Sequence, residues 1–122
     1  MDIKVNFDTT GLTEEEILEM IEERKHMPIG KYVSYRKDYL REVKPEYYAE
    51  LIASGELINH LWDIRDQAEA MKKMLVEQQQ KNSPEWKQME QDENFDFMKK
   101  WRLLEQFGAV ADEIIYKEII YV

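Results

Sequence analysis

The sequence contains no cysteine, and that absence excludes several classes of site at once. A disulfide framework, a thiolate zinc site, an iron–sulfur cluster and a cysteine nucleophile all require this residue. No apolar run approaches the length of a membrane span, and the first residues lack the basic start and apolar stretch of a secretory signal. We therefore expect a cytoplasmic protein that contacts no membrane.

Glycine and proline are also scarce, with four and three residues in a chain of 122, so few positions interrupt regular structure. This length suits one domain with a modest core. The content of 43% hydrophobic and 35% charged residues is typical of amphipathic helices with long solvated faces. We predict an all-α fold, in which a long antiparallel C-terminal helical hairpin packs against two or three shorter helices.

Two apolar series with alternating spacings of four and three residues predict this hairpin. The first is Leu57, Leu61, Ile64, Ala68, Met71 and Leu75, and the second is Phe97, Trp101, Leu104, Gly108, Ala111 and Ile115. Folding the chain about Asn82 places Ala68 near Phe97, Ile64 near Trp101 and Leu57 near Gly108. Small side chains then meet large ones, and Trp101 is buried with the other two tryptophans.

Capping residues mark where the helices begin and end. Thr13 and Glu16 have the spacing of a capping box, which predicts a helix from about Thr13 to Lys25. Gly55 is expected to end a short helix, and Ser83 to begin the last helical region. After the first helix and before this short one, Tyr32, Tyr35, Tyr39 and Val43 recur at helical spacing and predict the buried stripe of a second helix. Residues 2–7 alternate apolar and polar side chains, as an extended segment does.

Charge is unevenly distributed along this acidic chain, whose net charge is −9. Only residues 27–48 are basic, with five cations against three acids. These cations are candidates for contacting DNA phosphates: Lys31, Arg36, Lys37, Arg41 and Lys44. The alternative is an ordinary solvated helix face, which the same residues would also form.

The first helix has an acidic face that is a candidate surface for a protein partner. It consists of Glu15, Glu19, Glu22 and Glu23. Such a face could imitate a nucleic-acid backbone and occupy the basic groove of a DNA-binding protein. The alternative is that these carboxylates only keep the protein soluble.

No constellation of catalytic residues is present. Glu56, His60 and Asp63 share one helical face at metal-ligand spacing, but no matching motif follows elsewhere, and the same residues serve equally well in salt bridges. Neither Ser34 nor Ser54 lies in a nucleophile elbow, and no glycine-rich phosphate loop occurs. We therefore expect no enzyme activity, no metal and no cofactor.

Several short signatures occur together between residues 28 and 122. They are Pro28-Ile29-Gly30-Lys31-Tyr32, Tyr39-Leu40, Ser54-Gly55, His60-Leu61, Gln67-Ala68, Ala111-Asp112-Glu113-Ile114 and Glu118-Ile119-Ile120-Tyr121. In this order and spacing they resemble the transposon-encoded protein TnpV family. The resemblance implies a helical protein of a mobile genetic element with no known catalytic residue to carry over. It also divides the chain into an N-terminal extension, residues 1–26, and a TnpV-like domain, residues 27–122.

These observations together lead to a functional expectation. We expect a non-enzymatic accessory protein of a mobile element that binds a protein partner, DNA through residues 31–44, or both. The alternative is an acidic DNA-mimic inhibitor of a nucleic-acid-binding defence enzyme, of the anti-restriction or anti-CRISPR type. A homo-dimer formed through the long hairpin is a further expectation.

Overall fold

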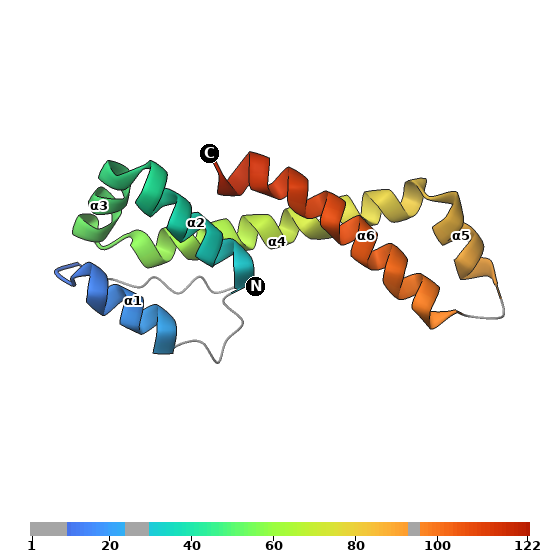
Figure 1. The fold of residues 1–122 in the computed structure, drawn as a ribbon, viewed down its shortest axis with the longest axis horizontal. Helices are drawn as coiled ribbons and strands as arrows, with labels where there is room; N and C mark the ends of the chain where they lie inside the picture. Colours follow the sequence, from blue (N-terminus) through green and yellow to red (C-terminus); the bar gives the residue numbers. More distant parts are fainter. Residues whose placement is uncertain (1–9, 24–29, 93–95) are drawn as a thin grey trace, which may run out of the picture. The chain divides into compact units, whose positions relative to one another are not determined.

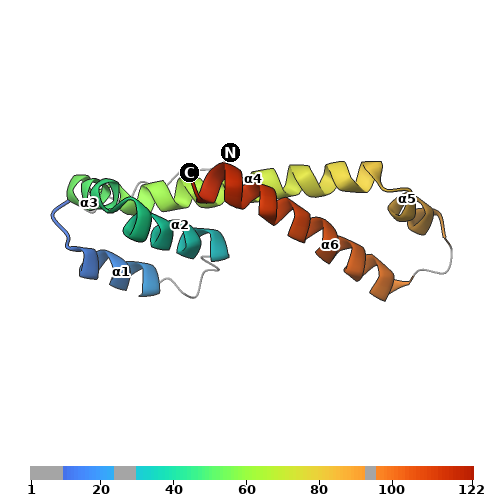
Figure 2. The same ribbon diagram turned by 45° about the horizontal axis from the view of Figure 1, so that its top comes forward.

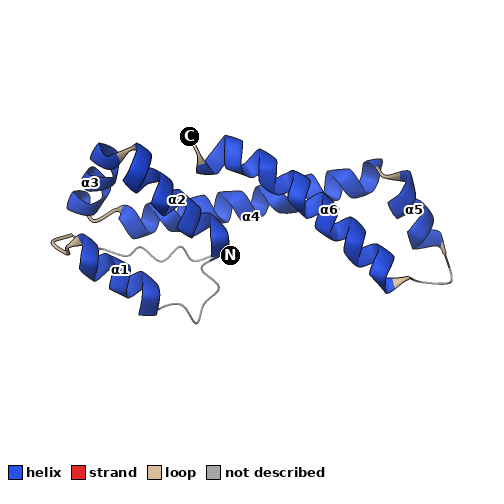
Figure 3. Ribbon diagram, in the orientation of Figure 1, coloured by secondary structure: helices blue, strands red, loops and turns tan. Residues whose placement is uncertain are grey.

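The computed structural model describes residues 10–23, 30–92 and 96–122, and these form helices joined by short connections (Figure 1). The helices are α1 (Glu14–Glu23), α2 (Gly30–Val43), α3 (Pro45–Ser54), α4 (Leu57–Asn82), α5 (Pro84–Gln91) and α6 (Phe97–Ile115), and α6 continues into a π-helical turn, η1 (Tyr116–Ile120). No strand occurs in these ranges (Figure 3). The all-α prediction is confirmed. The segment predicted to be extended, residues 2–7, lies outside the described residues.

The helix ends follow the predicted caps. The backbone N–H of Glu16 donates to Thr13 Oγ1 at 3.3 Å, and that of Trp86 donates to Ser83 Oγ at 3.1 Å. At the end of α3, Gly55 adopts the left-handed conformation with a φ of 76°. The N–H groups of Gly55 and Glu56 donate to the carbonyls of Ile52 and Leu51, which is the Schellman pattern. These three caps are confirmed.

One helix boundary has no counterpart in the sequence prediction. The region after Ser83 contains two helices, because α5 ends at Gln91 and α6 begins at Phe97. Asp96 caps α6, with its Oδ1 accepting from the N–H groups of Met98 and Lys99 at 3.1 and 3.3 Å. A short helix therefore lies between the two long ones, where the sequence prediction had a simple break at Asn82.

The chain forms two compact units, and α4 runs through both. Unit 1 comprises Met1–Asp66 with Tyr121, and unit 2 comprises Gln67–Ile120 with Val122. The predicted division at residue 26 falls in a range, 24–29, outside the described residues, and that division stays a prediction. Each unit has its own apolar cluster, described in turn below.

The core of unit 1 joins four helices. It consists of Ile17, Val33, Leu40, Tyr48, Leu51, Leu57, Ile58 and Leu61. Both ribbon views show α1 lying alongside α2 (Figures 1 and 2). Because Ile17 of α1 is fully buried in this cluster, α1 is an integral part of the unit's packing.

The buried face of α2 differs from the predicted tyrosine stripe. The buried side chains are Tyr32, Val33, Arg36 and Leu40, while Tyr35 and Val43 are exposed. The stripe prediction is wrong for Tyr35 and Val43, while Tyr39 is half-buried. The spacing of the tyrosines did not decide which face of α2 is buried, because Val33, Arg36 and Leu40 also recur at helical spacing. Burying this second series places two aliphatic side chains in the core.

An apolar cluster of unit 2 joins α5 and α6. Trp86 and Met89 of α5 pack with Leu103 and Phe107 of α6, and the ring centroids of Trp86 and Phe107 lie 6.0 Å apart. Val76 of α4 packs against this cluster. The first predicted apolar series forms a buried face of α4 from Leu57 to Ala68, because Leu57, Leu61, Ile64 and Ala68 are all buried. This part of the prediction is confirmed.

The predicted pairing of the second apolar series with the first is wrong. Phe97 and Trp101 are exposed instead of buried against α4. A Cβ on Gly108 would meet Cε of Lys72 at 3.6 Å, so Gly108 faces the lysine side chain where the prediction had Leu57. The physical reason is α5: both ribbon views show α6 diverging from α4 toward α5 (Figures 1 and 2). The beginning of α6 therefore lacks the contacts that a hairpin folded about Asn82 would give it.

Candidate functional site

The five cations predicted to contact DNA do not share one surface. Arg36 is only 5% exposed, and its Nε donates to Nε2 of His60 on α4 at 3.3 Å. Its guanidinium carbon also lies 5.7 Å from the centre of the Tyr39 ring. Arg36 is therefore part of the interior of unit 1, and only Lys31, Lys37, Arg41 and Lys44 have exposed or half-exposed side chains.

Carboxylates lie close to two of these remaining cations. Arg41 Nε is 3.7 Å from Glu14 Oε1, and Lys37 Nζ is 4.0 Å from Asp38 Oδ1. These pairs reduce the positive potential of the helix surface, because each cation is opposed by a neighbouring negative charge. The basic surface of α2 is consequently weaker than the sequence suggests.

The acidic face of α1 is only partly described. Glu15 and Glu19 are exposed, while the side chains of Glu22 and Glu23 lie outside the described residues. Glu14 takes part in the fold, since its Oε1 accepts from the hydroxyl of Tyr48 on α3 at 3.1 Å in addition to its ion pair with α2. The first turn of α1 thus connects three helices.

Three titratable groups in unit 1 have shifted pKa values, and burial lowers the pKa of Arg36. Burial raises the pKa of Tyr48 to about 12, and the charge of Glu14 acts in the same direction. Burial also lowers the pKa of His60, with the charge of Arg36 contributing further and Asp63 opposing. Neutral His60 can accept the hydrogen bond from the charged guanidinium of Arg36, so burial and this contact both favour the uncharged imidazole.

Unit 2 exposes three large apolar side chains near the beginning of α6, and the sequence analysis assigned two of them, Phe97 and Trp101, to the core. Phe97, Met98 and Trp101 are 66%, 60% and 50% exposed. We call these three residues the aromatic surface of α6. Lys99, Lys100 and Arg102 lie in the same turns. Sequence reasoning missed this surface because Phe97 and Trp101 belong to the apolar series that predicted a buried helix face, and the position of α5 leaves them uncovered.

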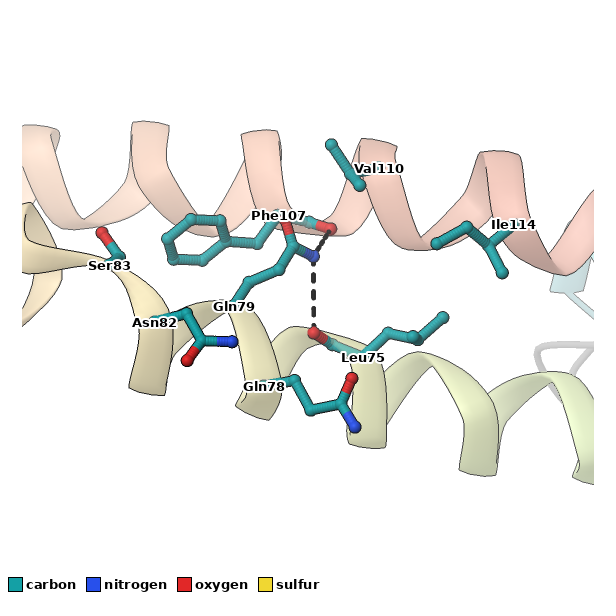
Figure 4. Close-up of a pocket in the computed structure, with 8 residues that line it drawn as sticks. All are labelled: Leu75, Gln78, Gln79, Asn82, Ser83, Phe107, Val110 and Ile114. Atoms are coloured by element: carbon teal, nitrogen blue, oxygen red, sulfur yellow. Dashed lines mark hydrogen bonds between the residues drawn. The ribbon is translucent and has the colours of Figure 1, made fainter.

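A groove of about 420 Å³ lies beside α4 and α6 in unit 2 (Figure 4). It is lined by Leu75, Gln78, Gln79, Asn82, Ser83, Phe107, Val110 and Ile114. Figure 4 shows Gln79 reaching from α4 to the backbone of α6, where its Nε2 donates to the carbonyl of Phe107 at 2.8 Å. We call this feature the amide groove. No sequence signal identified it, because its amides are far apart in sequence from its α6 wall.

Two of the described serines have structural roles, since Ser83 caps α5 and Ser54 Oγ donates to the carbonyl of Leu51, while Ser34 is exposed on α2. In the ranges that the structure describes, no group of three or more histidine, aspartate or glutamate side chains could hold a metal ion. Within the same ranges, no helix is long and apolar enough to cross a membrane. What the geometry does offer is surface for binding.

Comparison with models of protein families gives a match. The profile of the transposon-encoded protein TnpV family matches residues 16–120, so the similarity begins within α1 and includes the helices of both units. No curated protein and no solved structure matched the chain. The chain belongs to the transposon-encoded protein TnpV family.

Proposed function

We propose that this protein is a non-enzymatic accessory protein of a mobile genetic element, and that it acts by binding a protein partner through the aromatic surface of α6. The family match supports the association with a transposon. The exposure of Phe97, Met98 and Trp101 supports the binding mode and is the observation that carries the proposal.

Exposed side chains of these types favour a protein partner. Aromatic residues and methionine are enriched at interface centres, and monomeric proteins rarely leave large neighbouring apolar groups in water. The cations of the same turns, Lys99, Lys100 and Arg102, suit a partner whose apolar contact is bordered by acids. The overall charge of −9 works against a nucleic acid as the principal partner.

A photo-crosslinking amino acid at position 101 tests this proposal in the host cell. The matched control is the same amino acid in place of Tyr35, which is exposed on unit 1. We expect a protein that is crosslinked from position 101 and not from position 35. With that protein purified, Trp101→Ala should weaken binding by at least about 30-fold, as expected for a central interface aromatic. Equal crosslinking from both positions, or unchanged affinity of the variant, would contradict the proposal.

Direct contact between α2 and DNA is a second candidate, supported by the exposure of Arg41 and Lys44. Binding to labelled single- and double-stranded DNA would be measured at about 50 and 200 mM salt, a range in which phosphate-driven affinity falls steeply. Lys37→Glu with Lys44→Glu should abolish such binding while leaving the pair between Arg41 and Glu14 intact. The control, Lys99→Glu with Lys100→Glu, makes the same charge change on α6.

The acidic-inhibitor alternative rests on the exposure of Glu15 and Glu19. Deleting residues 1–26 is an unsuitable test, because it removes Ile17 from the core. Glu15→Lys with Glu19→Lys should instead abolish inhibition of a nucleic-acid-binding defence enzyme. Glu69→Lys with Glu77→Lys is the matched control, since both residues are exposed on α4. Inhibition retained by the first variant would exclude this alternative.

The long antiparallel hairpin is also part of the proposal. Gln79 contacts Phe107, and Lys72 Nζ lies 3.5 Å from Asp112 Oδ1. The second contact is earlier in α4 and later in α6 than the first, which supports opposite helix directions. Such a hairpin would present the aromatic surface at one end and the amide groove along its side.

A further inference from the structure

We propose that the amide groove of unit 2 is the docking site for a second copy of this chain, giving a symmetric homo-dimer. The proposal is independent of the protein partner proposed above, because it concerns a different surface. It rests on the composition of the groove, on the hydrogen-bonding capacity of its amides and on the exposure of its apolar wall.

The groove has no charged lining residue, although 35% of the chain is charged. A second copy carries the same net charge of −9, so two copies repel wherever acidic faces approach. An uncharged face is where two identical acidic chains meet at the lowest electrostatic cost. A heterologous partner attracted by charge would instead favour the acidic or basic surfaces of the chain.

The amides of the groove are suited to self-recognition. A two-fold interface brings the same patch of both copies together, so each polar group must be satisfied by that patch itself. Gln78 and Asn82 are exposed, and each carries both a donor and an acceptor. Gln79 keeps a different role, since its Nε2 bonds the carbonyls of Leu75 and Phe107 and fixes the floor of the groove.

The apolar wall of the groove supplies the second component. Val110 and Ile114 are 44% and 38% exposed, one helical turn apart on α6. Two such units side by side would form a four-helix arrangement that covers the exposed side chains of Val110 and Ile114. Val110 follows Phe97 by 13 positions, which places it roughly 220° further round the helix at about 100° per residue. The groove and the aromatic surface therefore face different directions.

Because the chain has no cysteine, a single introduced cysteine can form a disulfide only with a second copy. Gln78→Cys, Val110→Cys and Ile114→Cys would be compared with Phe97→Cys in the full-length protein under mild oxidation. Disulfides require Cα atoms within about 7 Å, so only positions beside the symmetry axis react readily. At least one groove position should crosslink about ten-fold faster than Phe97→Cys. Crosslinking at the control position as fast as at all three groove positions would overturn the proposal.

Solution mass provides the second arm. The chain has a mass of 14.8 kDa, and sedimentation equilibrium should show twice this value at high protein concentration. Gln78→Glu preserves the shape of the side chain but brings two like charges together at the interface, and it should raise the dimer dissociation constant at least about ten-fold. Trp101→Ala should leave the dissociation constant unchanged. A wild-type protein that stays at 14.8 kDa at all attainable concentrations would refute the dimer, while leaving the partner proposal untouched.

Discussion

Replacing Gly55 by alanine probes the corner between α3 and α4, where the structure makes two separate demands on this residue. The backbone is left-handed, with a φ of 76°. In addition, a Cβ at this position would lie 2.5 Å from both the backbone nitrogen and Oγ1 of Thr10. Because the nitrogen belongs to the backbone, rotation of the threonine side chain cannot relieve the clash. The whole segment at Thr10 would have to move away from the corner.

The size of each effect can be separated by a matched variant. Gly30 has nearly the same φ, 75°, but a Cβ there meets nothing within 4 Å. Gly30→Ala should therefore lower the free energy of unfolding by about 1–2 kcal/mol, through the strain of the left-handed backbone alone. Gly55→Ala adds overpacking of about 1–3 kcal/mol to this strain, so it should lower the free energy of unfolding by about 2–5 kcal/mol in total.

Urea unfolding followed by far-UV circular dichroism measures both variants, since both glycines lie in unit 1. A further chain lacking residues 1–10 removes Thr10, and in it the extra penalty of Gly55→Ala over Gly30→Ala should vanish. If Gly55→Ala were no more destabilising than Gly30→Ala in the full chain, the packing of Thr10 on this corner would be refuted.

Three further perturbations follow from the described contacts. Because burial lowers the pKa of His60 below its usual 6.5, the folded state favours the neutral ring, and the free energy of unfolding should fall as the pH drops below about 6.5. His60→Gln keeps an acceptor for Arg36 and should remove this pH dependence from urea unfolding measured between pH 7 and 5. Because the pKa of Tyr48 is raised to about 12, its contribution to the free energy of unfolding should be fully present below pH 10 and be lost as the pH rises toward about 12. Tyr48→Phe should remove this loss of stability at alkaline pH. An identical alkaline profile in the variant would contradict the assignment. Gly108→Ala should raise the unfolding free energy by about 1 kcal/mol, because alanine favours the helix and its Cβ would meet Lys72 Cε at an ordinary 3.6 Å; destabilisation in thermal unfolding would show that the contact is tighter.

The local features of the fold were predictable from the sequence because their physics is local. Thr13 and Ser83 accept from N–H groups three residues later, and Gly55 alone can adopt the left-handed cap without strain. The seam of α4 from Leu57 to Ala68 was equally predictable, since its apolar spacing allows one buried face. The class of the fold, most helix boundaries and the buried face of α4 from Leu57 to Ala68 therefore needed no tertiary information.

The candidate binding surfaces were not predictable in the same way. Two residues of the aromatic surface of α6, Phe97 and Trp101, have the spacing of a buried helix face, and the position of α5 decides that they stay exposed. The amide groove combines residues of two helices, and no local pattern marks which glutamines face it.

The sequence by itself determined that the chain is helical, where most helices begin and end, and that it resembles the TnpV family. Tertiary structure decided which face of each helix is buried. On α2, two series of residues have helical spacing, and packing chose the one that buries Arg36 against His60, 24 residues away. Such choices depend on contacts between distant segments, and a periodic pattern on one helix cannot specify the direction from which its neighbour approaches.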